Sequence, residues 1–176
     1  MTQAPTVPPE AGTTSRYKPP YNTQFSVFVD NKVGKLYDVL ELFHGHALTV
    51  AGFSVVDSTD HAVVRILTSN ADLARRLLDR NELPSSEASV LVVEVSGDKP
   101  LTEVCRVLTA AEVNIHFVYP LVVRPRGLPA VVLHTDDAVL SAQILRRKLF
   151  TLFGENELGD NASRGRPGSP NDPSTN

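Results

Sequence analysis

The residues best suited to binding chemistry lie in one glycine-containing turn, Asp30-Asn31-Lys32-Val33-Gly34-Lys35-Leu36. An alternating apolar segment precedes this turn, and a segment with helical spacing follows it. Its backbone N–H groups are therefore predicted to stand at a helix N-terminus, where they can bind a carboxylate, and Gly34 allows a ligand to come close. An alternative carries equal weight: Gly34 only makes a tight turn that Asn31 caps, because one such turn is a weak indication of a site.

The other reactive side chains form no catalytic pattern. His44 and His46 are the only clustered histidines, and the nearest acidic residue is Glu41, so we interpret them as a solvated helix end and not a metal site. Cys105 is predicted to be a small residue on the core side of a helix. The sequence has no Gly-rich phosphate loop, nucleophile elbow or paired acids at a strand end. We expect no catalytic residue, no metal and no cofactor, and a protein that is not an enzyme.

The composition is that of an ordinary soluble globular protein, with 176 residues, 41% hydrophobic residues, 21% charged residues and a net charge of −3. This charge gives no electrostatic reason to bind nucleic acid or an anionic membrane. The single cysteine cannot form an internal disulfide, and no apolar run is long enough to cross a bilayer. The first ten residues, MTQAPTVPPE, lack the pattern of a signal peptide, so a cytoplasmic location is predicted.

The strand, turn and helix around Gly34 occur twice, which indicates an internal duplication. The paired segments agree in order, spacing and polarity. They are Phe25–Val29 over Val90–Glu94 and Leu36–Leu40 over Leu101–Cys105 without a gap, then His61–Val64 over Pro129–Val132 after a slip of three residues.

Hydrophobic periodicity predicts a strand, a helix, two strands and a second helix in each copy. In copy one these are Gln24–Val29, Lys35–Phe43, Leu48–Val56, His61–Leu67 and a helix that Ser69 or Asn70 caps and that ends near Asp79. In copy two they are Ala88–Val95, Pro100–Ala111, Asn114–Val123, Ala130–His134 and Asp137–Leu149.

One more strand in each copy completes the ferredoxin-like βαββαβ pattern. Phe150–Phe153 can close copy two. Pro84 blocks an early start for the strand between the copies, so one long strand from about Glu87 to Val95 is predicted to serve both. The expected fold class is α+β, with two ferredoxin-like modules that form one antiparallel sheet and carry all helices on one face.

The domain boundaries follow from this pattern and from the tails. Residues 1–22 and 159–176 are rich in Pro, Gly, Ser and Asn and poor in large apolar side chains, so they are predicted to be a disordered arm and a disordered tail. Module 1 then covers residues 23–87, and module 2 covers residues 88–158.

The turn Asp30–Leu36, the helix after it and the strand containing Val113-Asn114-Ile115 resemble the ACT domain, a regulatory module that binds amino acids in metabolic enzymes. Residues 24 to about 158 resemble the free-standing tandem ACT proteins, which have two modules, a long strand between them and no catalytic domain. Copy one is also similar to the module of the acetolactate synthase regulatory subunit. The resemblance implies a non-catalytic amino-acid sensor that acts as an allosteric regulator or a regulatory subunit.

The resemblance also implies a ligand site that lies between modules. Its residues would be Asp30, Asn31, Val33 and Gly34 from copy one, with Asn114 and Ile115 from copy two. Val33 stands where the family usually has proline.

The pseudo-symmetric second site is expected to be degraded. Lys99 takes the position of Gly34, and Pro100 removes an N–H donor from the start of the helix. Thr49 stands where copy two has Asn114. An assembly module, or an acetolactate-synthase-like regulatory subunit, with vestigial ligand sites is therefore the alternative function.

The expected partners are a small amino acid, a metabolic enzyme and a second copy of the chain. A homodimer is predicted because one face of the sheet carries more apolar residues than a monomer usually leaves exposed to solvent. These residues are Val50, Phe53, Val55, Phe117 and Tyr119.

Overall fold

The chain alternates strands and helices in the order that the repeated pattern predicts. The computed structural model describes residues 20–57 and 59–159. Copy one contains β1 (Asn22–Asp30), α1 (Lys35–Glu41), β2 (Val50–Asp57), β3 (His61–Thr68) and α2 (Ala71–Arg80). After β4 (Ser85–Glu94), copy two contains α3 (Leu101–Thr109), β5 (Ile115–Pro120), η1 (Pro125–Gly127), β6 (Ala130–Thr135), α4 (Ala138–Arg147), β7 (Leu152–Phe153) and η2 (Glu155–Glu157).

The strand β4 joins the two copies. Its first half pairs antiparallel with β1, and its second half lies between β6 and β7, so the sheet has the order β2-β3-β1-β4-β6-β5 with β7 beside β4. The strand begins directly after Pro84. The prediction of one long strand that closes copy one and opens copy two is confirmed.

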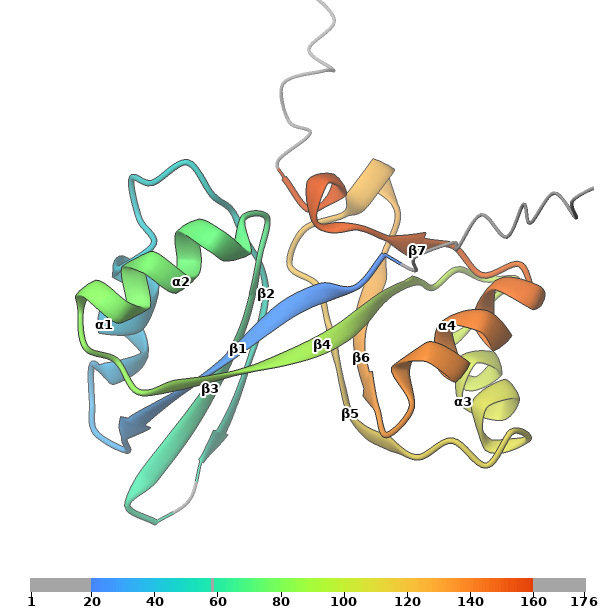
Figure 1. Cartoon of the computed structure of the whole chain (residues 1–176), viewed down its shortest axis with the longest axis horizontal. Coiled ribbons are helices and arrows are strands. Elements are labelled where there is room, and N and C mark those ends of the chain that lie inside the picture. The colour runs from blue at the N-terminus through green and yellow to red at the C-terminus, as the bar shows by residue number, and fades with distance from the viewer. Residues whose placement is uncertain (1–19, 58, 160–176) are drawn as a thin grey trace, which may run out of the picture.

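All four helices lie on one face of the sheet. Glu87 on β4 binds Arg75 of α2, and Leu91 and Val93, on the same side of β4 by alternation, pack with α3 and α4. The sheet curls strongly, so α1 and α2 stand at one end of the molecule and α3 and α4 at the other (Figure 1). The predicted α+β class with ferredoxin-like modules is confirmed.

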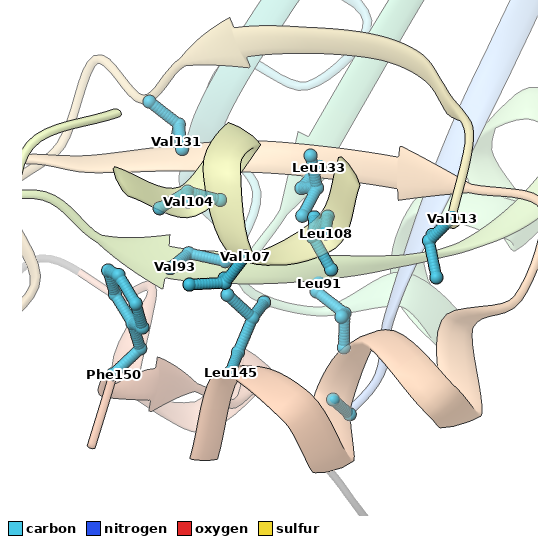
Figure 2. Close-up of a cluster of buried hydrophobic side chains, with 11 residues drawn as sticks. Leu91, Val93, Val104, Val107, Leu108, Val113, Val131, Leu133, Leu145 and Phe150 are labelled. Carbon is cyan, nitrogen blue, oxygen red and sulfur yellow. The ribbon is translucent and has the colours of Figure 1, made fainter. Parts of the chain in front are cut away.

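Each copy has its own core between the sheet and its two helices. In copy two, side chains from β4, β6, α3 and α4 point toward one another (Figure 2). In copy one, the equivalent core contains Phe25, Val27, Val39, Val64, Ile66 and Leu78 among others. Burial of one such side chain contributes roughly 1.5–3 kcal/mol, so these two clusters account for much of the stability of the fold.

A third core fills the inside of the curl and joins the copies. Leu67 of copy one packs there with Val90 and Val92 of β4 and with Tyr119 of copy two. The Tyr119 hydroxyl donates a hydrogen bond to Oε1 of Gln24 at 3.0 Å in a buried position. The two modules therefore form one packed unit.

The prediction that the apolar residues share one exposed face of the sheet is wrong, because the sheet curls. Tyr119 is only 6% exposed, because the other half of the same sheet covers it, and Phe117 packs against the same cluster. Phe53 and Val55 lie on the helix side, in register with Ile66 and Val64 of the copy-one core, and Val50 packs against that core. What stays exposed is the edge strand β2, with Phe53 at 36% and Val55 at 43%.

The ungapped alignment of the two first strands is wrong by one residue. Phe25 packs under the helices of copy one, and its counterpart under the helices of copy two is Leu91, because Val90 faces the third core. The helices do match without a gap, as the buried pair Val39 and Val104 shows. The turn of copy two is therefore one residue shorter, and a one-residue slip in a strand moves every side chain to the other face.

The described chain begins inside the segment that was assigned to the N-terminal arm. Tyr21 packs against the copy-two core, and the Asn22 amide donates a hydrogen bond to the Phe153 carbonyl at 2.9 Å. The rest of the predicted arm and nearly all of the predicted tail, residues 1–19 and 160–176, lie outside the described residues. Within the described ranges, no helix has the length and apolarity to cross a membrane.

Candidate functional site

The turn singled out by its sequence connects β1 to α1. Gly34 has a φ of +92°, a conformation that glycine adopts without strain, and it stands just before the first residue of α1. The Asp38 N–H donates to the Gly34 carbonyl at 2.9 Å, and the Asn31 N–H donates to the Asp60 carbonyl at 3.1 Å. The first bond starts the helix, and the second fixes the turn to the loop between β2 and β3. The Val33 side chain is fully exposed.

The charges of the turn are paired with one another. Lys32 Nζ lies 2.8 Å from Asp30 Oδ2, and Lys35 Nζ lies 3.0 Å from Asp38 Oδ2. The hydrogen bond from Lys32 and its charge hold the pKa of Asp30 below its usual value, and the same contact raises the pKa of Lys32. All four side chains are substantially exposed, so solvent screens both pairs and leaves them free to exchange partners with a ligand.

Asn114 and Ile115 lie in copy two at the start of β5. The Asn114 N–H donates to Asp136 Oδ1 at 3.1 Å, while its side chain is exposed and Ile115 packs against the copy-two core. The Gly34 turn instead borders the copy-one core, through Val29 and Leu36. The six predicted site residues therefore fall into two groups at different cores of one chain.

A cavity of about 200 Å³ opens beside the turn, between α1 and the link from α2 to β4. Its lining is apolar except for one cation, one carboxylate and one amide. The lining residues are Val29, Val39, Leu42, Leu83, Lys35, Asp38 and Asn81. Sequence reasoning missed this cavity, and the only local signal for it is the spacing of Lys35 and Asp38 on the first turn of the helix.

A larger cavity of about 410 Å³ lies at the other end of α1, under the loop to β2. Leu40, Phe43, Leu48 and Val50 contribute apolar surface, and the other lining residues are Tyr37, Glu41, His44, Gly45 and His46. The two histidines are exposed at its rim, as predicted for a solvated helix end. In the part of the chain that the structure describes, no group of three or more His, Cys, Asp or Glu residues could hold a metal ion.

The sequence profile of the ACT domain pair matches residues 22–161, which include nearly all of the described chain. The chain belongs to the ACT domain pair family. Family membership and the shared strand explain why two βαββαβ units form one sheet. The predicted resemblance to tandem ACT proteins is thus confirmed.

Solved structures show the same fold. The chain is similar to protein BT0572 from Bacteroides thetaiotaomicron, with a TM-score of 0.69 and 21% identity over 80% of this chain and 96% of that one. It is also similar to the ligand-free regulatory subunit of aspartate kinase from Thermus thermophilus, with a TM-score of 0.50 and 10% identity over 73% and 93% of the two chains. Aspartokinase alpha and beta subunits match with a TM-score of 0.50 and 13% identity over 73% and 92%. A search of curated proteins finds no match.

Proposed function

We propose that this ACT pair is a non-catalytic regulatory protein of the cytoplasm that binds a free amino acid and thereby biases the conformation of an enzyme of amino-acid metabolism. The observation that carries the proposal is the match of the ACT domain pair to residues 22–161. A regulatory effect requires that the ligand bind one of two states more tightly than the other. The similarity in fold to a regulatory subunit of aspartate kinase is consistent with this role.

The ligand site in this proposal combines Asp30, Asn31, Val33 and Gly34 with Asn114 and Ile115. Because these groups border different cores of one chain, a composite site needs a second copy whose β5 meets the turn of the first. The homodimer is supported by apolar residues on both edge strands of the sheet, Phe53 and Val55 on β2 and Val118 on β5.

Calorimetric titration against the twenty amino acids tests this function. We expect one chemical class to bind, Asn114→Ala to weaken binding by about 1–3 kcal/mol, and Thr49→Ala to change little. Gly34→Val should abolish binding at the turn. A Cβ at Gly34 meets no atom of the protein within 4 Å, so the new side chain would obstruct the ligand without clashing with the protein. A thermal melt must accompany Gly34→Val, because a φ of +92° strains any β-branched residue.

Two results would argue against the proposal. Absence of heat and of a thermal shift with every amino acid would remove the sensor function. Co-purification of one stoichiometric enzyme without any ligand dependence would favour the alternative, an assembly module or acetolactate-synthase-like regulatory subunit with vestigial sites. The specific observation behind that alternative is in the turn of copy two. There the Lys99 side chain donates a hydrogen bond to the Leu149 carbonyl, so a group of the protein itself occupies the space next to this turn.

A further inference from the structure

The cavity beside the Gly34 turn has walls that suit a small aliphatic group. Val39 is buried in the copy-one core, and Val29, Leu42 and Leu83 pack against that core while lining the cavity. Its volume of about 200 Å³ is below the 300–1,000 Å³ typical of drug-sized ligands. The walls and the volume together select a compact ligand with an aliphatic side chain.

The same cavity carries opposite charges at one wall. Lys35 and Asp38 stand one helical turn apart on α1, 44% and 58% exposed, with 3.0 Å between Nζ and Oδ2. An α-amino acid presents a carboxylate and an ammonium group at a similar spacing, so it can pair with both side chains at once. Asn81 donates through Nδ2 to the Leu77 carbonyl at 2.9 Å, which leaves Oδ1 to accept a hydrogen bond from the ammonium group.

Copy two differs at the corresponding place. Glu82 and Leu149 are matching residues, with φ values of +52° and +62° after α2 and α4, so Leu83 corresponds to Phe150. Lys99 reaches across this region, donates to the Leu149 carbonyl and places Nζ 5.7 Å from the centre of the Phe150 ring. In copy two, a side chain of the protein itself thus makes contacts at the place that corresponds to the cavity of copy one.

We propose that the cavity lined by Lys35, Asp38 and Asn81 binds one small aliphatic amino acid as its zwitterion. The carboxylate pairs with Lys35, the ammonium group pairs with Asp38 and Asn81 Oδ1, and the side chain lies against the aliphatic wall. This inference rests on the proposed function, whose ligand class it narrows, and it places that ligand in a second site. It differs from the composite site because all of its residues belong to one copy, so binding does not need a second chain.

The test is calorimetric titration of the full chain with L-valine, together with isovalerate, which lacks the ammonium group, and isobutylamine, which lacks the carboxylate. We expect Lys35→Ala and Asp38→Asn each to raise the Kd about tenfold or more, because each removes a charge-assisted contact. Leu83→Phe should abolish binding by filling the cavity. The matched control is Glu103→Gln, at the copy-two position of Asp38, which should leave the Kd unchanged. Isovalerate and isobutylamine should each bind at least about tenfold more weakly than L-valine.

Methyl-detected NMR locates the ligand independently of affinity. The methyl signals of Val39 and Leu42 should shift on addition of L-valine, and those of their counterparts Val104 and Val107 should not.

The outcomes separate this inference from the proposed function. If L-valine binds and Gly34→Val or Asn114→Ala abolishes binding while Lys35→Ala and Asp38→Asn do not, the inference is overturned and the composite site stands. If L-valine, L-leucine, L-isoleucine and L-alanine all fail to bind while another amino acid binds, the inference is again overturned and the sensor function stands. If no amino acid binds, both fall.

Discussion

The two copies agree in their cores and differ in the turn before the first helix. In copy two, Ser96 and Lys99 exchange two backbone hydrogen bonds of 3.0 and 3.2 Å, and the Ser96 hydroxyl donates to Asp98 at 2.6 Å, which lowers the pKa of Asp98. Pro100 then stands at the N-cap of α3 without an N–H. In copy one, Gly34 stands at the N-cap of α1 with a positive φ, and Lys35 and Asp38 stay at the surface. The copy-two turn is closed by the hydrogen bonds of Ser96, and the copy-one turn carries two ion pairs that are exposed to solvent.

A second difference lies after these helices. The link from α1 to β2 is longer than the link from α3 to β5, and it arches over the cavity of about 410 Å³. Both concave surfaces described for this chain therefore border α1. The comparison teaches that a duplicated fold can keep two equivalent cores while the turns and links around its helices diverge.

The largest expected effect tests the equivalence of the two cores. In the structure Leu78 matches Leu145, so the slip between the copies is one residue smaller than the sequence alignment gives. Each of the two leucines is 0% exposed, and each carbonyl accepts the N–H of the residue five positions later. Leu78→Ala and Leu145→Ala should each lower the free energy of unfolding by about 2–5 kcal/mol. Chemical denaturation of both variants measures this change.

The same variants test whether the copies unfold together. Because β4 runs through both modules and the third core joins them, each variant should unfold in a single transition. Two separate transitions in calorimetry, one shifted by each substitution, would show that the modules are independent.

A smaller effect is expected at the contact between the copies. Tyr119→Phe leaves Gln24 Oε1 without its donor in a buried site and should lower the free energy of unfolding by about 1–3 kcal/mol. Burial also raises the pKa of Tyr119, so the hydroxyl stays a donor at neutral pH. The matched control is Tyr37→Phe, at a tyrosine that is 66% exposed, where the change should stay within about 0.5 kcal/mol. Equal effects of the two variants would mean that this hydrogen bond does not link the copies.

Local signals in the sequence were sufficient for the order of elements. The sequence predicts Ser69 or Asn70 as the cap of one helix and Asp137 as the start of another. In the structure the Asn70 and Asp137 side chains each accept from the N–H three residues later, at 3.0 and 2.8 Å. Pro84 correctly limited the start of β4. These features depend on neighbours along the chain, which a sequence pattern contains.

The curl and the candidate site depend on contacts between distant segments. Tyr119 and Gln24 meet only because the sheet closes on itself, and no periodicity shows that closure. The 200 Å³ cavity depends on how far Leu83 stands from α1, and the hydrogen bond of Lys99 to the Leu149 carbonyl depends on the reach of that side chain. The Gly34 conformation could be predicted, but the separation of its turn from Asn114 could not.

The boundary between the copies should also respond to pH. Desolvation lowers the pKa of His134, and the nearby His116 and Arg65 lower it further. The centres of the His134 and Phe117 rings are 4.8 Å apart, and the guanidinium of Arg65, in copy one, lies over the Phe117 ring, 4.3 Å from its centre. The folded chain therefore binds fewer protons at His134 than the unfolded chain near its usual pKa of about 6.5, so stability falls as the pH falls through that value.

We expect the Tm of the wild type to drop more than that of His134→Gln between about pH 7.5 and about pH 5.5. A thermal melt at each pH measures the difference, and His44→Gln, on the exposed loop after α1, is the control. Identical pH profiles for the wild type and His134→Gln would show that this histidine does not couple the copies to pH.

The smallest expected effect is at Lys99, whose side chain contacts the Leu149 carbonyl and the Phe150 ring in copy two. Lys99→Ala removes the hydrogen bond to the Leu149 carbonyl and the cation above Phe150, so it should lower the free energy of unfolding by about 0.5–1 kcal/mol. Lys35→Ala should change it by less than about 0.5 kcal/mol, because its ion pair is exposed. Chemical denaturation measures the free energy of unfolding of both variants. A larger loss of this free energy in Lys35→Ala than in Lys99→Ala would mean that the lysine of the copy-one turn, and not that of the copy-two turn, is held by the protein itself.

Lys99→Ala also decides whether one side chain is enough to distinguish the copies. The substitution frees the surroundings of Leu149, but it does not supply a cation at the position of Lys35, where copy two has Pro100. The stoichiometry of L-valine in calorimetry should therefore stay at one per chain. A second equivalent bound by the variant would show that Lys99 alone closes copy two and that the missing cation does not matter.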